Sequence, residues 1–172
     1  MKEYIKPVLV LTLICLVISA ALAFTNQKTA PIIAQAEKTK AQAAQLEVLP
    51  EADSFTLLEL TGLPSSVKEV YRADNGAGFV VMLTIKGYGG DMKLICGIGK
   101  DGLITACSTL SQSETKGLGS KTAESPFKDQ FVGKDSSLSG VETISGATIS
   151  SKAYIGAIKD AFTAYEAAKG AA

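Results

Sequence analysis

The sequence predicts an α+β protein in which a single N-terminal transmembrane helix precedes a domain with a mainly antiparallel sheet flanked by helices. Three observations predict this class. An uncharged apolar run lies near the start of the chain, four segments rich in β-branched and apolar residues occupy its middle, and a helical apolar pattern ends it. The 172 residues suffice for one membrane segment and one domain with a core of its own.

The N-terminal segment has no charged residue from Pro7 through Gln27. Its apolar part, Val8 to Phe24, is near the lower end of the roughly 20 residues that span a bilayer as a helix, so we expect a membrane anchor. A cleaved signal peptide is the alternative, because Lys2 and Lys6 form a basic start and Ala21-Leu22-Ala23 resembles a cleavage site. The apolar run is longer than the core of a typical signal peptide, which favours the anchor.

A connecting helix is expected after the anchor. Thr29 is a candidate N-cap, Pro31 falls near the first turn, and Pro50 stops the pattern. We expect this helix to continue or kink from the anchor and to pack its thin apolar face on the domain or on a partner. The chain is thereby divided into residues 1–28, residues 29–50 and residues 51–172.

The middle of the chain predicts four strands, at residues 67–72, 78–86, 92–100 and 103–108. Asp101-Gly102 indicates a two-residue type I′ hairpin between the last two strands. Pairing outward from this turn sets Cys96 opposite Cys107, at a separation that a disulfide tolerates. Two buried thiols side by side are the alternative, and the frequency of buried cysteine favours them.

The C-terminal part predicts two helical segments. Ser125-Pro126 is expected to open a short helical piece through Phe131, with the serine as its cap. Further on, apolar residues recur at the spacing of an amphipathic helix, at Tyr154, Ile158, Ala161, Phe162 and Tyr165.

Small and hydroxyl residues lead into this last helix, in the run Ser145-Gly146-Ala147-Thr148-Ile149-Ser150-Ser151. The first turn of a helix presents unpaired N–H groups and the positive end of the helix dipole, and Gly146 lets a ligand approach the backbone. The run therefore predicts a phosphate site with the Thr148 hydroxyl inside it. Simple capping of the helix by Ser145 or Thr148 is the alternative, and the spacing alone favours it.

Composition excludes several classes of function. Lys+Arg and Asp+Glu are both 17, and no basic stripe is interleaved with aromatic residues, so a nucleic-acid partner is not expected. The chain has no histidine, which removes the usual general base and the commonest nitrogen ligand of metals. No cysteine cluster suits an iron–sulfur centre. Any redox chemistry would need an organic cofactor.

The run from Ser145 to Ser151 resembles the flavinylation motif of the G subunit of Rnf electron-transport complexes and of the related C subunit of the sodium-pumping NADH:quinone reductase. In that family a Ser/Thr-Gly-Ala-Thr core follows an acidic residue, and its threonine carries FMN through a phosphoester bond. Thr148 occupies the modified position here. Glu142 occupies the acidic position, where the family more often has aspartate.

Other motifs occur in the family's order and spacing, so the resemblance covers nearly the whole chain. The run from Glu114 to Gly119 resembles a Glu-Thr-x-Gly-Leu-Gly loop that packs near the flavin, and Gly87 to Gly90 resembles a Gly-Tyr-Gly-Gly turn. Thr29-Ala30-Pro31 and Val48-Leu49-Pro50 also match. Gln112 is a departure, because family members often have histidine at this position.

The resemblance implies a membrane-anchored flavoprotein subunit that relays electrons through a covalent FMN on Thr148. It would act within an Rnf-type ferredoxin:NAD⁺ oxidoreductase complex coupled to ion transport, and it would have no complete active site of its own. The residues implied around the flavin lie in the motifs described above, namely Ser145, Gly146, Ala147, Ser150, Ser151, Glu114, Thr115, Gly117, Leu118, Gly119 and Tyr88. A flavin-free anchored scaffold and a secreted stand-alone FMN-binding protein are the alternatives.

The resemblance also implies a place in the cell. Residues 1–28 would hold the cytoplasmic N-terminus and the transmembrane anchor, and residues 51–172 the FMN-binding domain on the extracytoplasmic side of the cell membrane. The implied partners are the other subunits of the complex, a flavin transferase and the lipid bilayer. Lysines lie on both sides of the apolar run, so charge alone does not orient the anchor.

Overall fold

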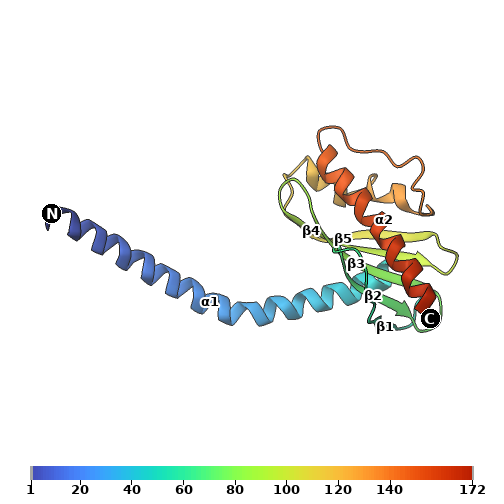
Figure 1. Cartoon of the computed structure of the whole chain (residues 1–172), viewed down its shortest axis with the longest axis horizontal. Helices are drawn as coiled ribbons and strands as arrows, with labels where there is room; N and C mark the ends of the chain where they lie inside the picture. The colour runs from blue at the N-terminus through green and yellow to red at the C-terminus, as the bar shows by residue number, and fades with distance from the viewer. Residues whose placement is uncertain (1, 172) are drawn as a thin grey trace. The chain divides into compact units, whose positions relative to one another are not determined.

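The computed structural model describes residues 2–171 (Figure 1). Met1 and Ala172, at the outer ends of two predicted segments, lie outside the described residues. The chain divides into two compact units, Met1–Lys40 and Ala41–Ala172. The elements follow in the order α1 (Lys2–Val48), β1 (Phe55–Leu58), β2 (Val67–Ala73), β3 (Gly78–Lys86), β4 (Asp91–Gly99), β5 (Ile104–Gln112), the 3₁₀ helices η1 (Gly119–Ala123) and η2 (Lys128–Phe131), and α2 (Thr148–Ala171).

The described part of the first unit is a single helical segment, the part of α1 that precedes residue 41. This helix contains the one candidate membrane span among the described residues, and none of its most apolar window is buried against protein. Its length, composition and exposed apolar surface suggest a single membrane anchor. Helix α1 runs through Pro31 without interruption, so the predicted helix start at Thr29 is wrong. The Thr29 hydroxyl donates instead to the carbonyl of Thr25, one turn earlier in the same helix, at 3.0 Å.

The second unit is built on a five-stranded sheet in which every strand pairs antiparallel with its neighbours along the chain. This meander with its flanking helices confirms the predicted α+β class. Strand β1 was not expected from the sequence, because it has only four residues and its middle side chains are exposed. Strand β4 is buried over most of its length, which agrees with its nearly continuous apolar sequence.

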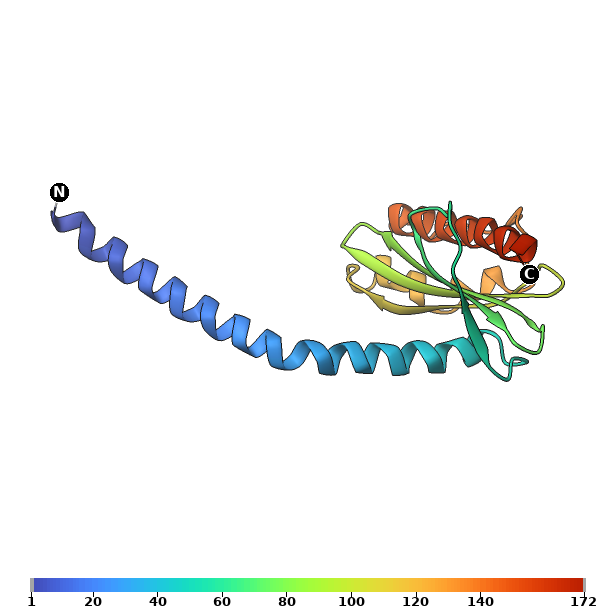
Figure 2. The same ribbon diagram turned by 60° about the horizontal axis from the view of Figure 1, so that its bottom comes forward.

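Both faces of the sheet are covered, and each cover forms a hydrophobic core. Helix α2 lies along one face and buries the larger core, which includes Leu94, Tyr154 and Ile158 (Figure 2). The last turns of α1 cover the other face, where Val48 and Leu49 pack in a smaller cluster with residues of the sheet. The end of α1 is therefore part of the domain that bears the sheet. The predicted boundaries at residues 28 and 50 stay predictions.

The hairpin between β4 and β5 differs from the predicted two-residue turn. The Gly99 N–H donates to the Leu103 carbonyl at 2.8 Å, which leaves a three-residue connection. Gly102 adopts φ +79°, the left-handed conformation common in three-residue hairpin loops. The pairing then shifts between Gly97 and Ile98, and this bulge restores the predicted pairing of Cys96 with Cys107.

The two cysteines are thiols in this structure. Their sulfur atoms are 3.4 Å apart, with Cys107 donating to Cys96. The hydrogen bond to Cys96, together with burial, raises the pKa of the Cys107 thiol well above its ordinary value. The short helical piece near Ser125 also differs from expectation, because η2 begins at Lys128 with Phe127 in the N-cap position and no side-chain cap.

Candidate functional site

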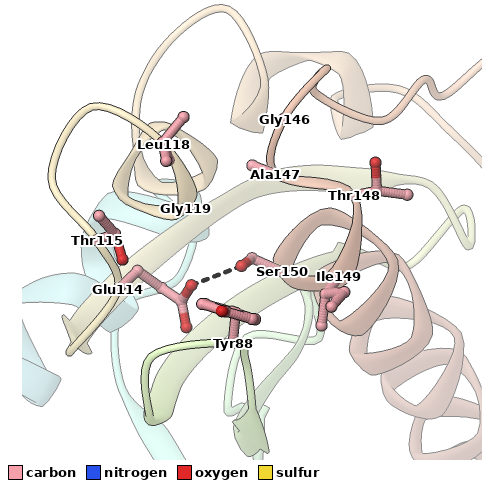
Figure 3. A pocket seen from close by; sticks show the side chains of 10 residues that line it. All are labelled: Tyr88, Glu114, Thr115, Leu118, Gly119, Gly146, Ala147, Thr148, Ile149 and Ser150. Carbon is pink, nitrogen blue, oxygen red and sulfur yellow. Dashed lines mark hydrogen bonds between the residues drawn. The ribbon is translucent and has the colours of Figure 1, made fainter.

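A cavity of about 400 Å³ lies where the start of α2 meets two loops of the sheet (Figure 3). One loop connects β3 to β4, and the other follows β5. The cavity is lined by residues from these three segments, namely Tyr88, Glu114, Thr115, Leu118, Gly119, Gly146, Ala147, Thr148, Ile149 and Ser150. The structure thus brings together nine of the twelve residues implied around the flavin, and Tyr88 and Ser150, the most distant of them in the chain, are 62 positions apart. Ser145, Gly117 and Ser151 do not line this cavity.

Thr148 is the first residue of α2, and its side chain is exposed. Ala147 occupies the position before the helix, and its carbonyl accepts the first helical hydrogen bond from the Ser151 N–H at 2.9 Å. The N–H groups of Thr148, Ile149 and Ser150 therefore have no carbonyl one turn earlier to bond. Among the described residues, no hydrogen bond involves the Thr148 hydroxyl, so it does not cap the helix.

Ser151 has a structural position behind the cavity. Its side chain is fully buried, and its hydroxyl donates to the Ala147 carbonyl at 2.9 Å while accepting the Ile144 N–H at 3.1 Å. These two bonds join the loop before α2 to the first turn of the helix. Gly146 adopts φ +81° in this loop, a conformation that glycine adopts without strain. The motif thereby holds Thr148 outward while the neighbouring Ala147 is buried.

Glu114 connects the loops around the cavity. Its side-chain oxygens accept one hydrogen bond from the Gly89 N–H at 2.9 Å and one from the Ser150 hydroxyl at 2.5 Å. The Ser150 hydroxyl has one proton and donates it here. The backbone N–H of Glu114 donates to the side-chain oxygen of Gln112 at 2.7 Å, so the glutamine in the position where histidine is common supports this loop.

Gly117 supports the same loop from outside the cavity. It adopts φ +79°, and its N–H donates to the Ser120 hydroxyl at 2.9 Å. The next residue, Leu118, is left with its side chain at the cavity. The left-handed conformation of this turn therefore explains the glycine at this position of the motif, although Gly117 does not line the cavity.

Three large apolar side chains at the cavity are exposed to solvent. Tyr88 is 73% exposed, Leu118 48% and Ile149 59%. Apolar side chains that gather at a cavity while exposed are typical of a binding site for a flat, partly apolar ligand. Ile149 was missed by the sequence analysis. Its signal was present, since it is a large apolar residue that lies off the stripe that α2 presents to the core.

The charge of the cavity comes from one residue. Glu114 is the only ionisable acidic or basic group among the lining side chains apart from the tyrosine, and none of them is a cation. Among the residues that the structure describes, no group of three or more His, Cys, Asp or Glu side chains could hold a metal ion. An anion at this site would thus meet backbone N–H groups at the start of α2.

The site fits the phosphate and ring of a flavin nucleotide. The unpaired amides and the helix dipole favour a phosphate, and the apolar side chains suit an aromatic ring system. The family model of the FMN-binding domain matches residues 87–163, which contain all three segments of the cavity.

Comparison with known proteins extends this match to the whole chain. The chain is 32% identical over 184 residues to the G subunit of an ion-translocating oxidoreductase complex from Methanosarcina acetivorans, with 98% of both chains covered. It is 30% identical over 194 residues to the G subunit of the Na⁺-translocating ferredoxin:NAD⁺ oxidoreductase complex of Acetobacterium woodii, with 96% of this chain and 93% of the relative covered.

The name of a third relative states a different transported ion. The chain is 29% identical over 164 residues to the G subunit of the proton-translocating ferredoxin:NAD⁺ oxidoreductase complex of Clostridium ljungdahlii, with 88% of this chain and 85% of the relative covered. The similarity thus extends to sodium and proton systems alike. With an FMN-binding domain and relatives that match it almost from end to end, this chain belongs to the family of G subunits of ion-translocating oxidoreductase complexes.

Proposed function

We propose that this chain is the electron-relay subunit of an Rnf-type ferredoxin:NAD⁺ oxidoreductase complex and that it carries FMN in a phosphoester bond on Thr148. The observation that carries the covalent bond is the Thr148 hydroxyl itself, which is exposed at the first turn of α2 and has no hydrogen-bond partner within residues 2–171. The names of the relatives support the complex, and the FMN-binding domain supports the cofactor.

The phosphate of the flavin would be held chiefly by backbone groups. Ser150 and Ser151 donate their hydroxyl protons to Glu114 and to the Ala147 carbonyl, so the amides of the first turn are the donors available to an anion. Ser145 does not line the cavity, but its exposed side chain in the loop just before α2 would add a further hydroxyl beside the phosphate. The ring would lie against the apolar side chains of Tyr88, Leu118 and Ile149, where it accepts and passes on electrons.

The proposal includes a place and partners. The candidate span in α1 would anchor the chain in the cell membrane with the N-terminus in the cytoplasm, and the flavin domain would lie on the extracytoplasmic side. Free FMN is too dilute there to refill an empty site by mass action, so a covalent bond retains the cofactor. A flavin transferase would form this bond, and neighbouring subunits of the complex would exchange electrons with it.

Intact mass tests the covalent bond. The full chain is co-expressed with a flavin transferase, and the expected gain is one FMN less one water, as an ester bond requires. Thr148→Ala should abolish this gain together with in-gel flavin fluorescence. Thr143→Ala is the matched control, because Thr143 is an exposed threonine five residues earlier, and it should keep the full gain. A wild-type chain of unmodified mass would favour the flavin-free scaffold.

An N-terminal label tests the anchor. The labelled chain should remain full-length in the membrane fraction. Release of a shortened soluble product would favour the secreted flavoprotein and would remove the anchor from the proposal.

A further inference from the structure

Three separate segments meet at the carboxylate of Glu114. The turn between β3 and β4 reaches it through the Gly89 N–H, and the first turn of α2 reaches it through the Ser150 hydroxyl. Figure 3 shows the bond to Ser150 at the edge of the cavity, with Tyr88 beside it. Both bonds join Glu114 to a different segment. The carboxylate therefore sets how closely the turn between β3 and β4, which contains Tyr88, approaches the start of α2.

The glycines around Glu114 leave space for this carboxylate. A Cβ atom added at Gly87 would lie 2.1 Å from Glu114 Oε1, and one added at Gly119 would lie 2.2 Å from Glu114 Oε2. Neither glycine adopts a positive φ, so backbone conformation does not explain them. Gly87 and Gly119, one in each glycine motif of the site, are thus explained by the room that one side chain needs.

The hydrogen bonds to the Glu114 carboxylate come from neutral groups. The groups that donate to its carboxylate are an amide and a hydroxyl, and neither of them carries a positive charge to compensate it. Its side chain is half-buried, where charge interactions are less screened than in bulk water. A fixed negative charge at this place opposes the uptake of electrons by any group in the cavity.

We propose that Glu114 is a positioning residue that assembles the flavin site from three segments and whose charge lowers the midpoint potential of the flavin. The inference deepens the proposed function and rests on it for the part that concerns the flavin. The positioning part concerns the chain alone. The two parts therefore have separate experiments.

A double-mutant cycle on the full chain without flavin, in detergent, tests the positioning. Gly87→Ala should lower the unfolding temperature of the domain, because its methyl group displaces the Glu114 carboxylate. The same substitution should cost much less in a Glu114→Ala background, where Met92 Cε at 3.3 Å is the nearest remaining neighbour. Equal costs in both backgrounds would overturn the positioning role. If Glu114→Ala does not fold, Glu114→Gln replaces it in the cycle. Glutamine loses fewer contacts than alanine, so the coupling between positions 87 and 114 should be weaker but of the same sign.

A redox titration of the flavin-loaded chain tests the charge. Glu114→Gln keeps the shape and an acceptor oxygen but removes the charge, so the midpoint potential should become more positive than in the wild type. Glu124→Gln is the matched control, because Glu124 is exposed and does not line the cavity, and it should leave the potential unchanged. An unchanged potential in Glu114→Gln would overturn the role of the charge.

Intact mass separates the two proposals. A wild-type chain that gains no flavin overturns the covalent bond to Thr148 and with it the role of the charge, while the double-mutant cycle still decides the positioning. A flavin gain with no coupling and no shift in potential overturns the role of Glu114 alone.

Discussion

Hydroxyl side chains at the start of α2 divide into two groups with different tasks. Thr148 and Ser145 are exposed, whereas Ser150 and Ser151 are buried and donate to protein groups. A sequence motif does not distinguish these tasks, because all four residues are small and polar. The distinction comes from the helical rotation about α2, which turns the two serines of its first turn toward the core.

Ser151→Ala should destabilise the domain by about 1–3 kcal/mol, because the Ile144 N–H and the Ala147 carbonyl both lose a buried partner. Chemical denaturation of the full chain measures this free energy. Thr163→Ala is the control, since Thr163 is an exposed residue of the same helix, and it should change stability by less than about 0.5 kcal/mol. Equal effects of the two substitutions would contradict the structural task of Ser151.

Asp74 predicts a dependence of stability on pH. Hydrogen bonds from Ser54 and Thr56, each at 2.6 Å, hold the pKa of the Asp74 carboxyl below its ordinary value. A depressed pKa contributes stability above the pKa of the unfolded chain, and this contribution is lost as the pH falls through the folded value. Asp74→Asn should therefore flatten the fall of the unfolding temperature below about pH 4. An acid limb identical to that of the wild type would exclude this role.

The site was predictable from the sequence to the extent that its motifs are local. Thr148, Leu118 and Tyr88 were expected near one another, and the cavity brings them together. The bond between Ser150 and Glu114 was not predictable, because it joins residues 36 positions apart through a geometry that only the folded sheet provides. Ile149 was not predicted, because its place at the cavity depends on loops that are distant in the sequence.

Among the elements, the hairpin of β4 and β5 shows why a correct pairing can follow from a wrong turn. Asp-Gly suits a two-residue loop, but it also suits a three-residue loop in which glycine takes the left-handed position. The structure has the second and compensates with a bulge. Next to the bulge, the Thr105 hydroxyl donates to the carbonyl of Val48. No pattern in the sequence of either segment predicts this hydrogen bond.

Gly97→Ala should destabilise the domain by about 1–3 kcal/mol through overpacking. An added Cβ would lie 2.4 Å from the Val48 carbonyl oxygen and 2.5 Å from the Thr105 hydroxyl, and the former belongs to backbone that cannot move away easily. Gly156→Ala is the control, because nothing lies within 4 Å of its added Cβ in helix α2. Thermal unfolding should separate the two variants, and a Gly97→Ala protein as stable as the wild type would contradict the close contact.

At the scale of the whole molecule, the sequence predicted an anchor, a connecting helix and a domain, but the packing groups residues 41–48 with the sheet. The prediction took Thr29 as the start of a connecting helix and Pro50 as its end. Pro31 lies inside α1, since a helix that bends tolerates proline. The apolar residues near the end of α1 determine what this end of the helix packs against.

Two truncated chains test this grouping. A chain that begins at residue 41 should unfold at nearly the temperature of the full-length domain, because Ala44, Val48 and Leu49 keep their contacts. A chain that begins at residue 51 exposes the face that contains Val80 and Ile95, and loss of two large buried side chains should cost about 3–6 kcal/mol. Equal stability of the two truncated chains would show that the end of α1 adds nothing to the domain.

The exposed side chains of Tyr88, Leu118 and Ile149 have a consequence for biogenesis. If FMN is attached as proposed, the protein without it exposes an apolar patch that chaperones, proteases and other copies of the chain can bind. Attachment would shield that area, so loaded molecules should escape quality control while bare ones are removed.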